Sequence, residues 1–216
     1  MPRQTGKTTT IAALLLWYVL FNESYNIAIL ANKMQQSREI LGRIQLAYEH
    51  LPKWLQQGVL EWNKGNIELE NGSKILASAT SSSAVRGGSF NLVYLDEFAF
   101  VSPNIQEEFF SSVYPTISSG KTSKVLITST PNGLDMFYRI WSDSERGKNT
   151  YKRVEVNWWD VPGRDQKFKE QTIANTSEEQ WRVEFECEFL GSQLTLIDPS
   201  FLRQMYPDRP LSMNDR

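Results

Sequence analysis

The chain has 216 residues, 40% of them hydrophobic, which suits one good-sized core and is too short for two full domains plus a linker. Its formal net charge of −2 excludes proteins that coat nucleic acid through a strongly basic overall field, so any DNA contact must come from a local patch or from segments outside the chain. One cysteine and one histidine exclude an internal disulfide and a Cys/His zinc site, and they fit a reducing compartment.

The first predicted element is a helix from about Thr8 to Leu20. Its apolar run, "IAALLLWYVLF", is about half of the roughly 20 residues that a membrane span needs, and no small-residue cleavage site follows it. We therefore expect a buried helix. A short apolar strand, "YNIAILAN", and a long helix from Gln35 to about Leu51 come next.

The middle of the chain alternates strands and helices. The segment "GNIELENGSKILAS" predicts a hairpin around Asn71-Gly72, a dipeptide typical of a two-residue turn. After a Ser/Gly-rich loop, the unbroken apolar run of "FNLVYLDE" predicts a central parallel strand. We then expect a helix over 103–112, a strand at "KVLITST", a turn at "PNG" and a helix over 136–142.

The last predicted elements are a strand at "YKRVEVNW" and a helix within "SEEQWRVEFECEFLG". The helix has Ser177 as N-cap, Gln180 three residues later and Gly191 just past its end. Residues 191–216 contain several prolines and are predicted to be a linker. The alternation predicts that residues 1–190 form an α/β domain with a largely parallel central sheet flanked by helices, in which ligands bind at the carboxyl ends of strands.

The segment "RQTGKTT" contains the end of a phosphate-loop pattern. Gly6, Lys7 and Thr8 match the last three positions of G-x-x-x-x-G-K-[ST]; the first glycine of the pattern would fall on Met1. The glycine lets backbone N–H groups face phosphates, the lysine reaches the β and γ oxygens, and the hydroxyl holds Mg²⁺. A bare G-K-T also arises by chance, so this motif needs support from elsewhere.

The segment "LVYLDEF" gives that support, because it delivers two adjacent carboxylates to the edge where a phosphate loop would lie. Asp96 can hold Mg²⁺, and Glu97 can orient or deprotonate an attacking water. A strand that ends in a solvated acidic turn is the alternative. The coincidence of both motifs on alternating elements favours the nucleotide site.

Two arginines and one strand tip complete the candidate site. Arg86, in a flexible Ser/Gly-rich loop, is either solvated or able to stabilise charge on a transferring phosphoryl group. Arg3, within the phosphate loop, is a second candidate for that role. The hydroxyls of Thr128, Ser129 and Thr130 end another apolar strand. Beside a nucleotide, they could sense the γ-phosphate and pass its loss to the following helix.

Taken together, "RQTGKTT", "AVRGGSFNLVYLDEFAF", "LITSTPNGLDMFYRIW" and "EEQWRVEFECEFLGS" resemble the ATPase half of the large terminase subunit of tailed bacteriophages, from Arg3 to about Ile197. The resemblance implies a P-loop NTPase fold of the additional-strand, catalytic-glutamate class. It implies ATP and Mg²⁺ as cofactors, Asp96 as the Mg²⁺-associated acid and Glu97 as the catalytic carboxylate. Arg86 matches an arginine that reaches a neighbouring subunit's ATP, and Arg3 one that acts within its own subunit. The nucleotide-binding residues would be Gln4, Thr5, Gly6, Lys7, Thr8 and Thr9, with Thr8 also on the metal, and the coupling residues Thr128, Ser129, Thr130 and Asn132.

The resemblance also implies partners: double-stranded DNA, a portal protein, a small terminase subunit and further copies in a ring, in the host cytoplasm and away from membranes. Relative to that family, we expect the chain to be truncated at both ends. The strand before the phosphate loop and an adenine-contacting stretch would be missing, and residues 191–216 would lead toward an absent nuclease domain.

Two other functions remain open. The chain could be a non-hydrolysing remnant that acts at most as a binding module, or a helicase-like DNA translocase. ATP turnover separates the remnant from both motors, and duplex unwinding separates the helicase from the packaging motor.

Overall fold

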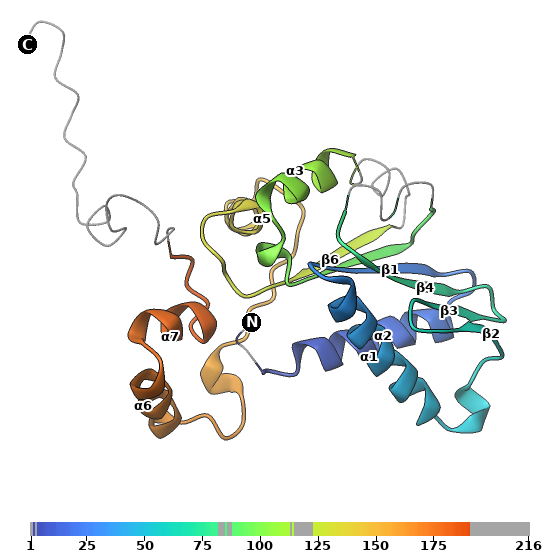
Figure 1. The fold of residues 1–216 in the computed structure, drawn as a ribbon, viewed down its shortest axis with the longest axis horizontal. Coiled ribbons are helices and arrows are strands. Elements are labelled where there is room, and N and C mark those ends of the chain that lie inside the picture. Colours follow the sequence, from blue (N-terminus) through green and yellow to red (C-terminus); the bar gives the residue numbers. More distant parts are fainter. Residues whose placement is uncertain are drawn as a thin grey trace, which may run out of the picture.

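The computed structural model describes residues 2, 4–81, 85, 88–112, 114 and 123–190. A central sheet lies between two helical layers, and a smaller helical lobe stands beside it (Figure 1). The strands are β1 (Asn26–Ala31), β2 (Val59–Trp62), β3 (Asn66–Leu69), β4 (Lys74–Ala79), β5 (Leu92–Asp96) and β6 (Lys124–Thr128). The α-helices are α1 (Lys7–Phe21), α2 (Met34–Glu49), α3 (Pro103–Ser112), α5 (Met136–Glu145), α6 (Gln166–Asn175) and α7 (Glu178–Glu184).

The sheet has the strand order β2-β3-β4-β1-β5-β6 and is mostly parallel, as predicted. Strands β4, β1, β5 and β6 run in the same direction, while β3 is antiparallel to both β2 and β4. All five residues of β5 are buried, which explains why its sequence is apolar without alternation. Parallel strands place their carboxyl ends at one edge, so the residues after β5 and β6 become neighbours.

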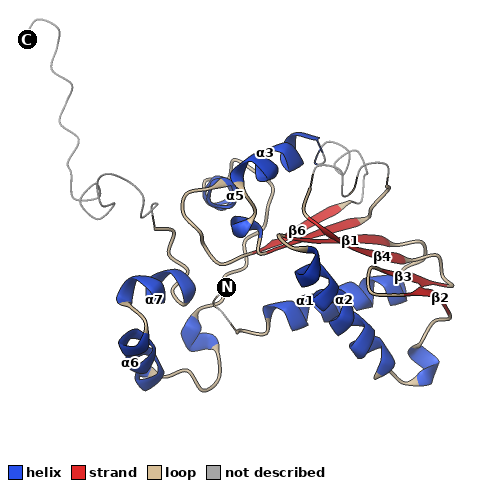
Figure 2. Ribbon diagram, viewed as in Figure 1, coloured by secondary structure: helices blue, strands red, loops and turns tan. Residues whose placement is uncertain are grey.

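Helices α1 and α2 cover one face of the sheet, and α3 and α5 cover the other (Figure 2). On α2, Ile40, Leu41, Ile44 and Tyr48 recur at helical spacing and are buried against the sheet. Side chains of β5 alternate between the layers: Leu92 and Tyr94 face α1, whereas Val93 and Leu95 face α5. Each face of the sheet therefore has its own apolar core.

The predicted hairpin is confirmed as β3 and β4, but its turn differs from the one expected. Gly72 has a φ of 80°, whereas Asn71 is not among the residues with positive φ. The two-residue turn that favours Asn-Gly requires positive φ at both positions, so the connection is a longer turn with a single left-handed glycine. A short strand that the sequence did not predict, β2, continues the sheet beyond β3.

Two other predictions were wrong. The segment 151–158 forms no strand, and only residues 158–160 adopt a short 3₁₀ turn. The last helix begins after its N-cap Ser177 as predicted, but it ends at Glu184, well before Gly191. Cys187 follows with a left-handed φ of 55°, and the Glu188 N–H donates to the Arg182 carbonyl, which turns the chain out of the helix.

Residues 158–190 form what we call the α6–α7 lobe, drawn in orange at the lower left of Figure 1. The rings of Trp158 and Phe168 pack edge-on against Trp181, which also stacks on Phe185 at 4.5 Å. Trp181 is completely buried. The lobe thus has a small aromatic core separate from the two cores of the sheet.

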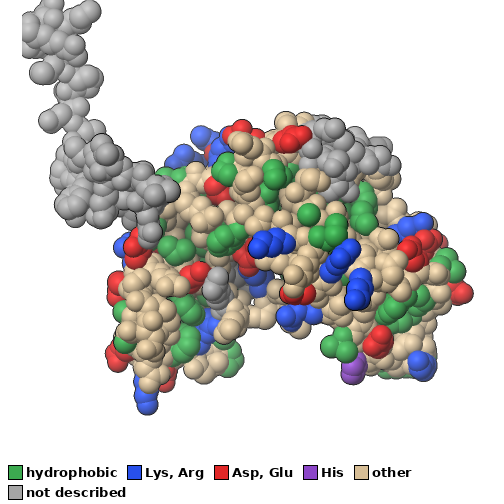
Figure 3. All heavy atoms as spheres, in the orientation of Figure 1, with side chains coloured by type: hydrophobic (Ala, Val, Ile, Leu, Met, Phe, Trp, Pro, Cys, Tyr) green, Lys and Arg blue, Asp and Glu red, His purple; other side chains and the backbone are tan. Residues whose placement is uncertain are grey.

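The surface is of mixed charge. Lys and Arg side chains lie among Asp and Glu side chains over the face shown in Figure 3, in keeping with a net charge of −2. In the part of the chain that the structure describes, no helix combines the length and the apolar character that crossing a membrane requires.

Candidate active site

Three segments meet at the carboxyl edge of the parallel strands: the loop before α1, the residues after β5, and the residues after β6 (Figure 1). The register of β5 and β6 places Asp96 directly opposite Thr128. The sequence motifs that suggested a nucleotide site are therefore brought together, as expected for an α/β fold.

The turn into α1 depends on Gly6. This residue caps the helix with a φ of 77°, a left-handed conformation that glycine adopts without a steric cost, and an added Cβ would meet no atom within 4 Å. No side chain caps the helix, so its first N–H groups are available to an anion. These N–H groups and the positive end of the helix dipole are the features that favour an anion at the start of a helix.

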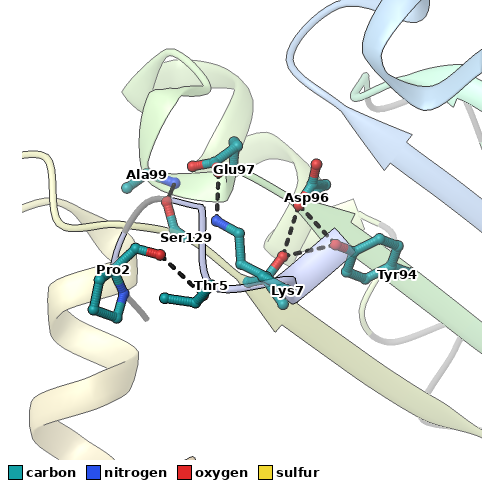
Figure 4. Close-up of polar contacts among 9 residues, drawn as sticks. Pro2, Thr5, Lys7, Tyr94, Asp96, Glu97, Ala99 and Ser129 are labelled. Atoms are coloured by element: carbon teal, nitrogen blue, oxygen red, sulfur yellow. Dashed lines mark hydrogen bonds and ion pairs between the residues drawn. The ribbon is translucent and has the colours of Figure 1, made fainter. Parts of the chain in front are cut away.

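An ion pair between Lys7 and Glu97 joins the start of α1 to the end of β5 (Figure 4). The Lys7 Nζ lies 2.5 Å from the Glu97 Oε1, and the lysine side chain is only 10% exposed. The second carboxylate oxygen of Glu97, Oε2, is buried and accepts no hydrogen bond from the described residues. This oxygen is a free acceptor next to a cation, the arrangement needed to hold a water molecule.

The backbone of Glu97 is in a strained conformation. Its φ of 48° and ψ of 44° lie in the left-handed region, which costs a non-glycine residue on the order of 1–2 kcal/mol. Strain of this kind persists where the surrounding structure holds the chain in place. Here it turns the Glu97 side chain toward Lys7.

Asp96 is held by two hydroxyl groups (Figure 4). The Tyr94 hydroxyl donates to Asp96 Oδ1 at 2.7 Å, the Thr128 hydroxyl donates to the same oxygen at 2.8 Å, and the two hydroxyls are 2.8 Å apart. Burial, together with the charge of Asp96, raises the pKa of Tyr94, so its proton is retained. Both bonds use Oδ1, which fixes the direction of Oδ2.

Removing these hydroxyls should destabilise the protein. We expect Tyr94→Phe and Thr128→Val each to lower the free energy of unfolding by about 1–3 kcal/mol, because each removes a donor from a buried carboxylate. Urea denaturation of the two variants and the double variant tests this. The double variant should lose less than the sum of the single losses, because the three groups form one network; strictly additive losses would contradict that.

The segment after β6 also contacts the turn that follows Glu97. The Ala99 N–H donates to the Ser129 hydroxyl at 3.1 Å, and the Asn132 side-chain amide donates to the Ala99 carbonyl at 2.9 Å. With Thr128 on Asp96, three of the four predicted coupling residues contact the acidic turn or its carboxylate. The fourth, Thr130, is buried.

The remaining predicted residues lie as follows. The Thr5 hydroxyl donates to the Pro2 carbonyl, Thr8 is half-buried in the first turn of α1, and the Thr9 hydroxyl accepts a bond from Arg43 of α2. Arg3 and Arg86 lie outside the described residues.

Sequence reasoning missed Arg164, which links the α6–α7 lobe to the loop before α1. Its Nη2 donates to the Gln4 carbonyl at 3.2 Å, and its guanidinium lies 5.4 Å from the ring centres of both Phe168 and Phe185. Burial lowers the pKa of Arg164. No local signal could have found this residue, because 160 positions separate the partners.

Two of the predicted site residues carry oxygen atoms of the type that Mg²⁺ prefers. Thr8 and Asp96 offer a hydroxyl and a carboxylate oxygen, both hard ligands. Among the described residues, no group of three or more acidic, histidine or cysteine side chains could hold a metal by itself. A Mg²⁺ ion at this edge would therefore take further oxygens from water or from a bound phosphate, its usual mode in nucleotide sites.

Comparison with known proteins identifies a family. Residues 1–203 match the family described as "Terminase large subunit, T4likevirus-type, N-terminal". Among solved structures, the ATPase domain of the large terminase of Thermus phage P74-26 is similar with a TM-score of 0.68 at 19% identity, over 88% of this chain and 86% of that one.

Longer terminases are similar over part of their length. The large terminase of bacteriophage HK97 has a TM-score of 0.70 at 19% identity, over 87% of this chain and 45% of that one. The large terminase of a thermophilic bacteriophage, in complex with ADP, has a TM-score of 0.64 at 12% identity, over 87% and 46%. The chain therefore spans a little under half of these proteins, and at such identities the likeness shows the fold.

Proposed function

Because the chain belongs to the terminase large-subunit family, in its ATPase-domain part, we propose that it binds Mg-ATP and hydrolyses it to move double-stranded DNA into a viral procapsid. The observation that carries the proposal is the contact of Lys7 with Glu97 at the start of α1, beside Asp96. It places a cation, an anion-binding helix end and two carboxylates at one edge of the sheet. The similarity to a terminase solved with ADP supports nucleotide binding.

Each group has a defined task in this proposal. The N–H groups at the start of α1 and the Lys7 ammonium bind phosphate oxygens, with Gln4, Thr5, Gly6 and Thr9 shaping the loop. Thr8 and Asp96 would hold Mg²⁺, which would supply positive charge against the phosphate oxygens. Binding of phosphate draws Lys7 away from Glu97, and the freed carboxylate then orients water and accepts its proton.

The segment after β6 would couple ATP hydrolysis to DNA movement through its contacts with the residues that follow β5. Thr128 touches Asp96, while Ser129 and Asn132 hold the turn that follows Glu97, so a shift of the acidic turn moves this segment and α5 behind it. We propose Thr130 as part of the same unit. Arg86 is proposed to act on the ATP of a neighbouring subunit, and Arg3 within its own.

The wider assembly completes the proposal. Copies of the chain would act as a ring on a portal protein, with a small terminase subunit, in the host cytoplasm. We propose residues 1–190 as the ATPase domain and 191–216 as a linker toward a nuclease domain.

Calorimetric titration with Mg-ATP tests the first step. We expect binding by this chain, or by the chain extended with a strand at its amino terminus, and no binding by either form in the presence of excess pyrophosphate. Failure of both forms to bind would refute the proposed function. Binding without turnover in both forms would favour the non-hydrolysing remnant, and ATP-driven duplex unwinding would favour the helicase-like translocase.

A further inference from the structure

Arg164 is fixed in place at the start of α6. Its N–H donates to the Val161 carbonyl at 3.2 Å, and the next residue, Asp165, caps the helix by accepting from the Phe168 N–H at 2.8 Å. Its guanidinium lies 5.4 Å from the ring centres of Phe168 and Phe185, within the range of a cation–π contact. The arginine therefore has little freedom to turn, and its Nη2 points from the lobe to the loop before α1, which lies beside it in Figure 1.

The residue that Arg164 contacts has an unfavourable backbone conformation. Gln4 has a φ of 54°, in the left-handed region that a residue with a Cβ adopts only at a steric cost. Such conformations persist where neighbouring groups hold the chain in place. The Gln4 side chain is exposed, and its carbonyl accepts the bond from Arg164 at 3.2 Å. Arg164 therefore holds this residue through its main chain.

The same bond fixes the direction of the next N–H group. The carbonyl of one residue and the N–H of the next lie in one peptide plane and point in opposite directions, so a donor on the Gln4 carbonyl turns the Thr5 N–H away from the lobe. Within the part of the chain that the structure describes, the N–H groups of Thr5 and Gly6 donate to no main-chain carbonyl. Gln4 and Gly6 have positive φ, whereas Thr5 between them does not. Left-handed residues next to ordinary ones direct successive N–H groups into a concavity that suits an anion.

We propose that Arg164 is a positioning residue for phosphate binding: it holds the Gln4 carbonyl so that the Thr5 N–H faces the phosphates of the bound nucleotide. This inference rests on the proposed function, which puts those phosphates at the start of α1 beside Lys7. Arg164 acts through the backbone, since its Nη2 stays on the carbonyl while the N–H at the other end of the peptide binds phosphate. The lobe thus contributes to the affinity for nucleotide and takes no part in the chemical step.

The test compares arginine variants by calorimetric titration with Mg-ATP and, separately, with magnesium pyrophosphate. Arg164→Met removes the donor but keeps an apolar stem against the two rings, and Arg164→Lys keeps a charged donor. Arg182→Met is the matched control, because Arg182 lies in the same lobe and its side chain bonds to Glu188 instead of the loop. The Thr5 amide proton is followed by NMR as pyrophosphate is added, and urea denaturation shows whether each variant is folded. The parent is this chain, or its amino-terminally extended form if only that form binds.

For Arg164→Met we expect the dissociation constants of both ligands to rise about two- to tenfold, the usual effect of losing one hydrogen bond. KM for ATP should rise while kcat stays the same, because the lost interaction serves the bound substrate and the transition state alike. The Thr5 amide proton should move downfield with pyrophosphate in the parent and less so in Arg164→Met. Arg164→Lys should bind more tightly than Arg164→Met, and Arg182→Met should bind as the parent does.

A folded Arg164→Met protein that binds both ligands as tightly as the parent would overturn this inference and leave the proposed function standing. An equal loss of affinity in Arg182→Met would also overturn it, since the loss would then come from the lobe as a whole. Failure of this chain and of its extended form to bind either ligand would refute the proposed function, and this inference with it. If Arg164→Met does not fold, Arg164→Gln, with its shorter side chain, takes its place in the same comparisons.

Discussion

Replacing Glu97 with glutamine is expected to leave ATP bound and to stop its hydrolysis. Glutamine keeps the size of the side chain but cannot accept a proton, so turnover should fall by about 10²–10⁴-fold, the usual contribution of a general base. Affinity for ATP should stay the same or rise, because the Lys7 Nζ would no longer be held by a carboxylate 2.5 Å away. Initial rates of phosphate release and calorimetric titration measure the two effects.

Glu68→Gln is the matched control. Glu68 also pairs with a lysine, Lys74 at 3.0 Å, but on β3 and β4 rather than on the strands that end at the candidate site. The ATP turnover of Glu68→Gln should equal that of the parent chain. Equal turnover in Glu97→Gln and the parent would remove Glu97 from the role proposed for it.

Replacing Lys7 with alanine is expected to weaken binding itself. A hydrogen bond to a charged group contributes about 1.5–3 kcal/mol, so the dissociation constant for Mg-ATP should rise about ten- to hundredfold. The Lys7 side chain is only 10% exposed, which limits its replacement by water. Calorimetric titration gives the constant, and urea denaturation of the same sample shows whether the fold is intact.

Lys74→Ala serves as its control, since it removes a lysine of the other ion pair. An Lys7→Ala protein that is folded and binds Mg-ATP as tightly as Lys74→Ala would count against the phosphate-loop assignment.

The sequence predicted those elements whose burial or turn conformation depends on residues close in the chain. The run Leu92 to Leu95 is apolar because β5 is buried on both faces, and Asn71-Gly72 marks the hairpin because a left-handed residue is needed there. The failures have tertiary causes. Residues 151–158 have strand composition but pair with none of the strands that the structure describes. Helix α6 has no buried residue, so it leaves no apolar stripe in the sequence.

The part of the candidate site that lies at the carboxyl ends of strands could be predicted from the sequence. Lys7, Asp96 and Glu97 meet because a helix start and a strand end share the carboxyl edge of the sheet. In the sequence, Tyr94 is one residue of an apolar run. Its bond to Asp96 follows from the alternation of β5, which directs both side chains to the same face of the sheet. Arg164 is brought to Gln4 by packing of the α6–α7 lobe, which no spacing in the sequence encodes.

The bond from Arg164 goes to the main-chain carbonyl of Gln4, a residue with a φ of 54°. A carbonyl offers the same oxygen whatever side chain it belongs to, but its direction changes when the peptide plane turns. The contact between the lobe and the loop before α1 therefore depends on the backbone conformation at Gln4 and not on the identity of the Gln4 side chain. A rotation of that peptide would turn the Gln4 carbonyl away from Arg164, whose guanidinium also contacts the rings of Phe168 and Phe185.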